Sequence, residues 1–309
     1  MKEVGIGVDI GGSHIVCCAV DMGTGKPIEG TVSEEKVNNK GSKDEVFTTW
    51  SKAINSTIEL IEKASLRGIG FAMPGAFNYK TAVALYEGND KYENLYGVNL
   101  KDELPKYLSE EYIELRFIND ATAFAIGEVW YGQAKDSNRS IAITLGTGFG
   151  SALIDEDIPI VSRQDVPLHG CFWHLPFKNG IADDYFSTRW FVNTFENKSG
   201  QKASGVKDVA IDASGSGIGQ QVFDEFSINL VEFLAPWLNK FMPDTLVIGG
   251  NVSKAIDLFL PRVQEELSRL EISLQIYPSD LMEEAALIGS ARLLDDTFWR
   301  KVKLDLPEK

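Results

Sequence analysis

Residues 4–20 read VGIGVDIGGSHIVCCAV, two short apolar runs of β-strand type separated by Gly11-Gly12-Ser13-His14. Adjacent glycines between two such runs are typical of a β-hairpin, because the turn requires positive φ angles. Residues 140–154, SIAITLGTGFGSALI, repeat this pattern around Gly146. We therefore predict a chain of two halves that are built alike. Each half opens with a strand, a glycine turn and a second strand.

The other expected elements alternate between strands and helices, which is typical of an α/β protein. Between Val46 and Ile61 the apolar residues recur at spacings of 3 and 4, as a helix with one buried face requires. The remaining expectations are helices over 121–130, 222–241 (bent or interrupted near Pro236), 252–267 and 281–294, strands over 68–73, 112–118, 245–248 and 272–276, and loops over the Gly/Ser-rich stretch 197–219.

The chain is strongly acidic: its 309 residues include 30 Lys and Arg against 45 Asp and Glu, a formal net charge of −15. Its length predicts two domains. An acidic surface repels nucleic acid and anionic lipid, although a local pocket of backbone N–H groups can still bind phosphate. No apolar run approaches a membrane span of ~20 residues, and three cysteines imply no disulfide framework. We expect a cytoplasmic protein without nucleic-acid or membrane partners.

Three glycine-rich turns are candidate nucleotide-binding loops. Asp9-Ile10-Gly11-Gly12-Ser13 combines turn N–H groups that could cradle phosphate with a carboxylate that could hold Mg²⁺ directly or through water. Gly146-Thr147-Gly148-Phe149-Gly150 is chemically similar, and a triphosphate needs groups on both of its sides. Gly249-Gly250-Asn251 suits contact with a nucleotide base or ribose. A surface hairpin would equally explain the first turn, and a plain strand-to-helix turn the third.

Asn119 and Asp120 stand where an expected strand ends and a helix begins. One explanation of Asp120 is structural, because a carboxylate at this position can cap the helix N-terminus. The other is catalytic: Asp120 would be a general base that takes a proton from an attacking hydroxyl, while Asn119 orients the substrate. A carboxylate suits phosphoryl transfer, because the loose transition state depends more on positioning than on strong basicity.

Six segments in this order resemble the ROK family of repressors, open reading frames and sugar kinases. They are, in chain order, GVDIGGSHI, MPGAF, INDATAFAIGE, TLGTGFGSALI, VIGGNVS and EEAALIGSARL. The resemblance spans nearly the whole chain. It implies a two-lobed, actin-like ATPase fold (a duplicated RNase H-like fold) with a central cleft. The N-terminal lobe would comprise residues 1–118 plus about 290–309, and the C-terminal lobe residues 119–289. A homodimer is a further family expectation.

The resemblance also implies roles for individual residues. Asp9 would assist Mg²⁺–ATP through water, and Asp120 would be the catalytic base, with Asn119 bonding a neighbouring sugar hydroxyl. Gly75, in the MPGAF turn, would approach the sugar through its backbone. The residues implied to line the phosphates are Gly11, Gly12, Ser13, Thr147 and Gly148, and those implied to lie by the adenosine are Gly249, Gly250 and Asn251.

The chain departs from the family pattern where a GE-x-GH segment and a CxCGxxGCxE segment are expected. Cys171 stands in place of the first sugar-binding glutamate, and Asp183 in place of the second. His174 matches the family's histidine, but the three zinc cysteines are missing, so we predict no zinc there. His174 is then either a sugar contact or a packed histidine. A thiol is a poor acceptor, so Cys171 predicts a weaker or missing contact with one sugar hydroxyl.

These residues together predict an ATP-dependent sugar kinase that phosphorylates a hexose or an N-acetylated amino sugar and uses ATP and Mg²⁺. The alternative is a catalytically degraded protein that senses sugar or nucleotide on the same fold. Cys171 and the missing zinc cluster favour the alternative, whereas the intact Asp9, Asp120 and glycine turns favour the enzyme. A phosphohydrolase or acyl kinase of the same superfamily is a third reading.

Overall fold

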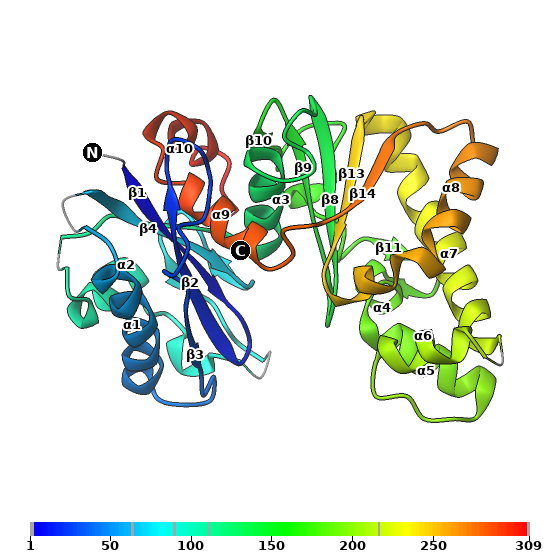
Figure 1. The fold of residues 1–309 in the computed structure, drawn as a ribbon, viewed down its shortest axis with the longest axis horizontal. Helices are drawn as coiled ribbons and strands as arrows, with labels where there is room; N and C mark the ends of the chain where they lie inside the picture. The colour runs from blue at the N-terminus through cyan, green and yellow to red at the C-terminus, as the bar shows by residue number, and fades with distance from the viewer. Residues whose placement is uncertain (1–2, 63–64, 89–90, 111, 216, 308–309) are drawn as a thin grey trace. The chain divides into compact units, whose positions relative to one another are not determined.

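The computed structural model describes residues 3–62, 65–88, 91–110, 112–215 and 217–307. It divides into two compact units (Figure 1). Unit 1 comprises Met1–Lys135, Asp157–Pro159 and Glu283–Lys309, and unit 2 comprises Asp136–Glu156 and Ile160–Met282. The division expected from the sequence differs from this one at residues 119–135, 157–159 and 283–289. The first and last differences arise because α3 (Asp120–Trp130) packs against α9 (Glu284–Arg292), so both helices lie in unit 1.

The sheet of unit 1 has the strand order β3-β2-β1-β4-β7. The expected hairpin is confirmed, because β1 and β2 pair antiparallel with Ile10 opposite Ile15. The other two strands, β4 and β7, run parallel to β1. The bounds are β1 Val4–Ile10, β2 His14–Asp21, β3 Ser33–Lys36, β4 Leu66–Met73 and β7 Leu115–Asn119. Since β1, β4 and β7 are parallel, Asp9, Met73 and Asn119 lie at one edge of the sheet.

Helix α1 (Lys43–Glu59) packs against β2 and β3, while α9 packs against β1 and β4. The start of α1 is a capping box, in which Ser42 and Glu45 satisfy each other's backbone N–H groups. The shorter elements of unit 1 are β5 Phe77–Asn78, β6 Val83–Ala84, η2 Glu93–Leu95, α2 Leu100–Glu103, η3 Leu104–Tyr107, β10 Ile158–Pro159 and α10 Asp296–Val302.

Helix α9 lies unusually close to the backbone of the sheet in unit 1, because glycines face it. A Cβ atom on Gly7 of β1 would lie 1.8 Å from the Leu287 carbonyl oxygen, and one on Gly70 of β4 would lie 1.8 Å from the Ser290 carbonyl oxygen. Real Cβ contacts are never this short. The small residues at these positions therefore set the distance between helix and sheet.

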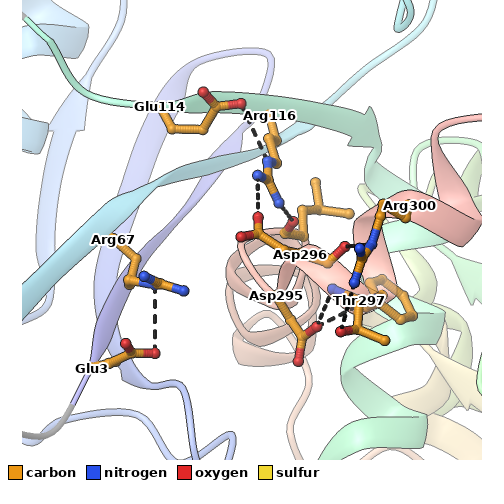
Figure 2. Close-up of polar contacts among 10 residues, drawn as sticks. Glu3, Arg67, Glu114, Arg116, Asp295, Asp296, Thr297 and Arg300 are labelled. Atoms are coloured by element: carbon orange, nitrogen blue, oxygen red, sulfur yellow. Dashed lines mark hydrogen bonds and ion pairs between the residues drawn. The ribbon is translucent and has the colours of Figure 1, made fainter.

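Arg116 of β7 fastens the C-terminal segment to the sheet of unit 1 (Figure 2). Its guanidinium donates hydrogen bonds to the Leu293 carbonyl at 2.7 Å and to Asp296 Oδ1 at 2.6 Å. It also lies 5.3 Å from the centre of the Trp299 ring. The Arg116 side chain is only 11% exposed, so these contacts are largely shielded from water.

The sheet of unit 2 repeats the central strand order of unit 1, as β9-β8-β13-β14. The second expected hairpin, β8 with β9, is confirmed, with Leu145 opposite Phe149. Its strands are β8 Arg139–Leu145, β9 Phe149–Asp155, β13 Thr245–Gly249 and β14 Gln275–Pro278. The remaining elements are η4 Leu168–Gly170, β11 Pro176–Phe177, β12 Gly180–Ile181, α4 Ala182–Tyr185, α5 Thr188–Ser199, α6 Val206–Ala213, α7 Ile218–Phe241, η5 Asn251–Leu258 and α8 Leu260–Arg269.

Several expected elements are wrong in detail. In unit 1 the strand expected over 112–118 begins only at Leu115. In unit 2 helix α6 occupies part of the stretch 197–219 that was expected to be loops. Helix α7 is not interrupted at Pro236, because the buried residues on both sides of the proline hold it against the core. The helix expected over 252–267 is divided, because Ala255 leaves the helical conformation in η5 and α8 begins only before Pro261.

Unit 2 has an aromatic core in which phenylalanines pack edge to face and at tilted angles. Phe233 of α7, for example, contacts Phe149 of the hairpin at a centroid distance of 6.1 Å and Phe186 at 5.2 Å. This core joins the hairpin to the helices behind it. In the described ranges, no helix combines the length and the apolar character that a membrane span requires.

Candidate active site

The turn of the first hairpin is fixed through its carbonyl groups. Tyr92 Oη donates to the Gly11 carbonyl at 2.6 Å, Asn39 Nδ2 donates to the Gly12 carbonyl, and the Val37 amide donates to the Ser13 carbonyl at 2.9 Å. Within the described part of the chain, the amides of Gly12 and Ser13 donate to no protein acceptor. Two amides on a rigid turn are therefore available to an anion, as the phosphate hypothesis requires.

Asp9 lies at the end of β1 and is partly buried. Its pKa is raised to about 7, first by burial and then by repulsion from the carboxylates of Asp120 and Glu283. Carboxylates that repel one another at a sheet edge favour a cation between them, and oxygen donors are the ones Mg²⁺ prefers. Among the described side chains, no three His, Cys, Asp or Glu form a group that could hold a metal directly. The carboxylates of Asp9, Asp120 and Glu283 therefore fit a Mg²⁺ ion that Asp9 would hold through water.

The structural explanation of Asp120 as the cap of α3 is wrong. Asn119 is the N-cap, and its side-chain oxygen accepts from the Thr122 amide at 3.2 Å. Asp120 is the first helical residue, and its Oδ1 accepts from the Ala121 amide and from Asn119 Nδ2, both at 2.8 Å. Burial raises the pKa of Asp120, against these hydrogen bonds and the charge of Lys91, which lower it. A carboxyl with a raised pKa and a fixed orientation suits a general base.

The MPGAF turn follows β4 at the same sheet edge as Asp120. Tyr79 Oη donates to the Met73 carbonyl at 3.0 Å and lies 3.4 Å from Asn119 Nδ2, which links this turn to the segment that holds Asn119 and Asp120. A Cβ on Gly75 would meet nothing within 4 Å. The backbone of Gly75 is therefore exposed, and its predicted contact with sugar stays a prediction.

The second hairpin turn, in unit 2, is fixed by two polar contacts. Asp183 Oδ1 accepts from the Phe149 amide at 2.7 Å, and the Thr188 amide donates to the Gly146 carbonyl at 2.8 Å. The amides of Thr147 and Gly148 donate to no protein acceptor in the described ranges. This turn therefore offers an anion two amides, as the first one does. That both turns hold one triphosphate stays a prediction, because they belong to different units.

Gly250 must be glycine because the chain that leaves β13 passes close to the backbone at the end of the neighbouring strand β8. Its φ is 81°, and a Cβ there would lie 2.4 Å from the Leu145 carbonyl oxygen, beside the second hairpin turn. The Ser253 hydroxyl donates to the Gly250 carbonyl at 2.7 Å, and Lys254 Nζ donates to Asn251 Oδ1 at 2.8 Å. The Gly249-Gly250-Asn251 turn is thus held against the second hairpin within unit 2, where the adenosine is expected.

Cys171, Trp173 and His174 form an uncharged cluster in unit 2. Cys171 Sγ lies 3.7 Å from His174 Nδ1, and the Trp173 ring, 50% exposed, lies 5.4 Å from the His174 ring. Burial raises the pKa of Cys171 to about 11, and burial and the nearby His169 lower the pKa of His174. Both groups are therefore neutral at pH 7.

Asp183 lies next to this cluster, since its amide donates to the Trp173 carbonyl at 3.0 Å. Its carboxylate is already used, because Oδ1 fixes the hairpin and Oδ2 lies 3.1 Å from Arg189 Nη2. The sugar contact expected for Asp183 stays a prediction. In the structure its carboxylate holds the second hairpin turn.

Four residues around the first hairpin turn were not assigned to it from the sequence. Asn39 and Tyr92 fix the turn, Lys91 lies over Gly12, and Glu283 faces Asp9. They come from three loops far apart in the chain, so no local spacing could have joined them. The one available signal is Glu283, which opens the closing-helix motif EEAALIGSARL.

The chain is similar to several known proteins over most of its length. A glucokinase of Thermotoga maritima is 22% identical, with 94% of this chain and 97% of the relative covered. An N-acetyl-D-glucosamine kinase of Pectobacterium carotovorum is 23% identical over 77% and 84% of the two chains, and a xylose repressor of Caldicellulosiruptor bescii is 23% identical over 93% and 77%. The crystal structure of a ROK family glucokinase from Streptomyces griseus with glucose and AMPPNP superposes with a TM-score of 0.73 at 24% identity, covering 94% of this chain and 98% of that one.

The family model for the ROK family matches residues 5–297, which include both glycine hairpins, Asp120 and the Gly249-Gly250-Asn251 turn. The structural match indicates the same two-lobed α/β fold. This chain therefore belongs to the ROK family.

Proposed function

We propose that the protein is an ATP-dependent sugar kinase whose acceptor is a hexose or an N-acetylated amino sugar. The observation that carries the proposal is Asp120, a half-buried carboxylate with a raised pKa, oriented by Asn119 at the sheet edge that also holds Asp9 and the free amides of the first turn. The related glucokinase and N-acetyl-D-glucosamine kinase support this substrate class.

In the proposed reaction, Asp120 accepts the proton of a sugar hydroxyl while the oxygen forms a bond to the γ-phosphorus of ATP. The bond between that phosphorus and the bridging oxygen breaks, and its electron pair leaves with ADP. Asn119, which already donates to Asp120, orients a neighbouring hydroxyl. The turn amides hold phosphate oxygens. Mg²⁺, when bound, neutralises charge on the phosphates.

The test is a coupled assay of ADP release with glucose, mannose, N-acetylglucosamine and N-acetylmannosamine. In Asp120→Asn we expect kcat to fall by about 10²- to 10⁴-fold, because the base is lost while the hydrogen bonds of the site can persist. Asp102→Asn, an exposed aspartate of α2, is the matched control and should keep full activity. Equal activity of the wild type and Asp120→Asn would contradict the assignment of the base.

A sensing protein is the second candidate, favoured by the neutral Cys171 where the family pattern expects a charged sugar contact, and by the related xylose repressor. Thermal shift measurements separate the two candidates. A kinase should be stabilised by Mg²⁺–nucleotide and by one sugar, and should release ADP with that sugar. Stabilisation by a sugar without ADP release would favour the sensor.

A further inference from the structure

Lys91 extends over the first hairpin turn from the segment between β6 and η2. A Cβ atom on Gly12 would lie 3.0 Å from Lys91 Nζ, 3.1 Å from Cε and 3.3 Å from Cδ. The far half of the lysine side chain therefore occupies the space that a side chain at position 12 would fill. The ammonium group lies beside the residue whose amide is free to bind an anion.

The chain next to Lys91 is anchored to the same turn. Tyr92 is buried, with its ring 5.4 Å from that of Trp50, and its backbone has a left-handed φ of 54°. Its hydroxyl donates to the Gly11 carbonyl at 2.6 Å, and its amide donates to the Asn39 carbonyl at 2.8 Å. The left-handed backbone conformation of Tyr92, which is strained for a residue with a side chain, is thus held by contacts with the turn. This anchor positions Lys91 over Gly12.

Lys91 is an exposed cation that lies near the carboxylate of Asp120. In the part of the chain that the structure describes, its ammonium makes no hydrogen bond or ion pair with another side chain. Its charge lies close enough to Asp120 to favour the ionised carboxylate there. Lys91 therefore acts on both the turn amides and the catalytic base, and in the proposed reaction the group between those two is the phosphoryl group in transfer.

We propose that Lys91 binds the terminal phosphate of the phosphoryl donor and stabilises its charge during transfer, and that residue 12 is glycine to leave room for the lysine. This inference rests on the proposed kinase function. The ammonium donates a charge-assisted hydrogen bond to a non-bridging oxygen of that phosphate and stays protonated throughout. The proton of the sugar hydroxyl goes to Asp120, and ADP leaves with the electron pair of the broken bond.

The test compares Lys91→Met, which keeps the length of the side chain, with Lys91→Arg, which keeps the charge. Calorimetry without sugar measures the binding of inorganic tripolyphosphate, ATP and ADP. In Lys91→Met we expect about 10-fold weaker binding of tripolyphosphate and ATP, the scale of one charge-assisted hydrogen bond, and less than about 3-fold weaker binding of ADP. Lys91→Arg should stay within about 3-fold of the wild type for all three. Lys101→Met, an exposed lysine of α2, is the control.

Kinetics supply a second readout with the sugar that the wild type accepts. Lys91→Met should lower kcat as well as raise KM for ATP, since the contact strengthens as charge develops on the phosphoryl group. Unchanged tripolyphosphate binding, or an equal loss for ATP and ADP, would overturn the assignment. Circular dichroism melting checks that each variant is folded.

The two proposals fail separately. If the wild type phosphorylates a sugar and Lys91→Met has unchanged kcat and KM, the kinase stands and the role of Lys91 is wrong. If no sugar supports ADP release, but Lys91→Met alone loses tripolyphosphate binding, the kinase is wrong and Lys91 stands as a phosphate-binding residue.

Discussion

The two glycine hairpins have the same backbone plan and different surroundings. Each joins two antiparallel strands, each presents two amides without protein acceptors in the described ranges, and each opens a sheet with the same central strand order. Pairing Ile10 with Ile15, and Leu145 with Phe149, makes Thr144 the counterpart of Asp9. The acid is therefore present in one hairpin and absent from the other.

The supports of the two turns also differ. In unit 1 neutral donors, Tyr92 and Asn39, hold the carbonyl groups, and three carboxylates and Lys91 surround the turn. In unit 2 the carboxylate of Asp183 holds an amide of the hairpin. The duplicated fold thus presents two similar turns with free amides in the described ranges, and charged side chains gather around the first turn. Four experiments test this difference between the two units.

The largest expected effect concerns helix packing. Gly7→Ala places a methyl group 1.8 Å from the Leu287 carbonyl oxygen, so α9 or β1 must shift, and we expect a loss of about 3 kcal/mol in the free energy of unfolding. The counterpart in unit 2 is Ala142, where a Cβ is already accommodated. Ala142→Gly should cost only about 1 kcal/mol. Urea denaturation followed by circular dichroism measures both. Equal losses of unfolding free energy in the two variants would show that helices pack on the two sheets at similar distances.

The next effect is the dependence of the free energy of unfolding on pH that Asp9 confers. Its pKa is about 7 in the folded protein against an ordinary value of 3.8, so between these values the folded state binds more protons than the unfolded state. Its contribution to stability is complete below pH 3.8 and is lost as the pH rises to 7. We expect a loss of about 2 kcal/mol between pH 4 and 7, less than the full shift implies because the group is partly exposed.

The check on this prediction is Asp9→Asn, which should flatten the dependence of the free energy of unfolding on pH between 4 and 7. Thr144→Val, at the corresponding place in unit 2, is the control and should leave the wild-type slope unchanged. A slope that persists in Asp9→Asn would show that other groups are responsible.

A smaller effect compares two arginines, one in each unit, that lie near the start of a strand and donate to a backbone carbonyl. Arg116 fastens the segment after α9 in unit 1, and Arg139 donates to the Phe241 carbonyl at 2.9 Å at the end of α7 in unit 2. Arg116→Met should lower the free energy of unfolding by about 1.5 kcal/mol, because it leaves the Leu293 carbonyl without its donor. Arg139→Met should cost less, since the Arg139 side chain is 33% exposed against 11% for Arg116. Thermal melting of both variants shows which of them loses more stability.

The smallest effect concerns the supports of the turns. Tyr92→Phe removes one hydrogen bond to the Gly11 carbonyl, and we expect a loss of about 1 kcal/mol in ADP affinity, roughly fivefold. Asp183→Asn removes the negative charge next to the Phe149 amide and should have an effect of similar size. Calorimetry with ADP measures both. A change in sugar KM alone in Asp183→Asn would return this residue to the sugar contact expected from the sequence.

Local patterns in the sequence were sufficient for the two hairpins, most strands and the position of Asp120, because each depends on neighbours a few residues away. The glycines marked the places of the two turns, although the expected positive φ is wrong for Gly11, Gly12, Gly146 and Gly148. A polar residue that ends an apolar run marks a strand end. They were not sufficient for α6, the divided helix at 251–269 or the continuous α7, where packing against a distant core outweighs local propensity.

Strand and helix alternation, glycine pairs and motif order are local properties, and they were enough to predict a duplicated α/β chain with two glycine turns and a carboxylate at the end of a strand. Which side chains support those turns became visible only in the folded chain. Tyr92, Asn39 and Lys91 reach the first turn from segments outside the motif, and Asp183 reaches the second turn from α4. The physical reason is that a hydrogen bond or charge acts over a few ångströms of space, whatever the distance along the chain.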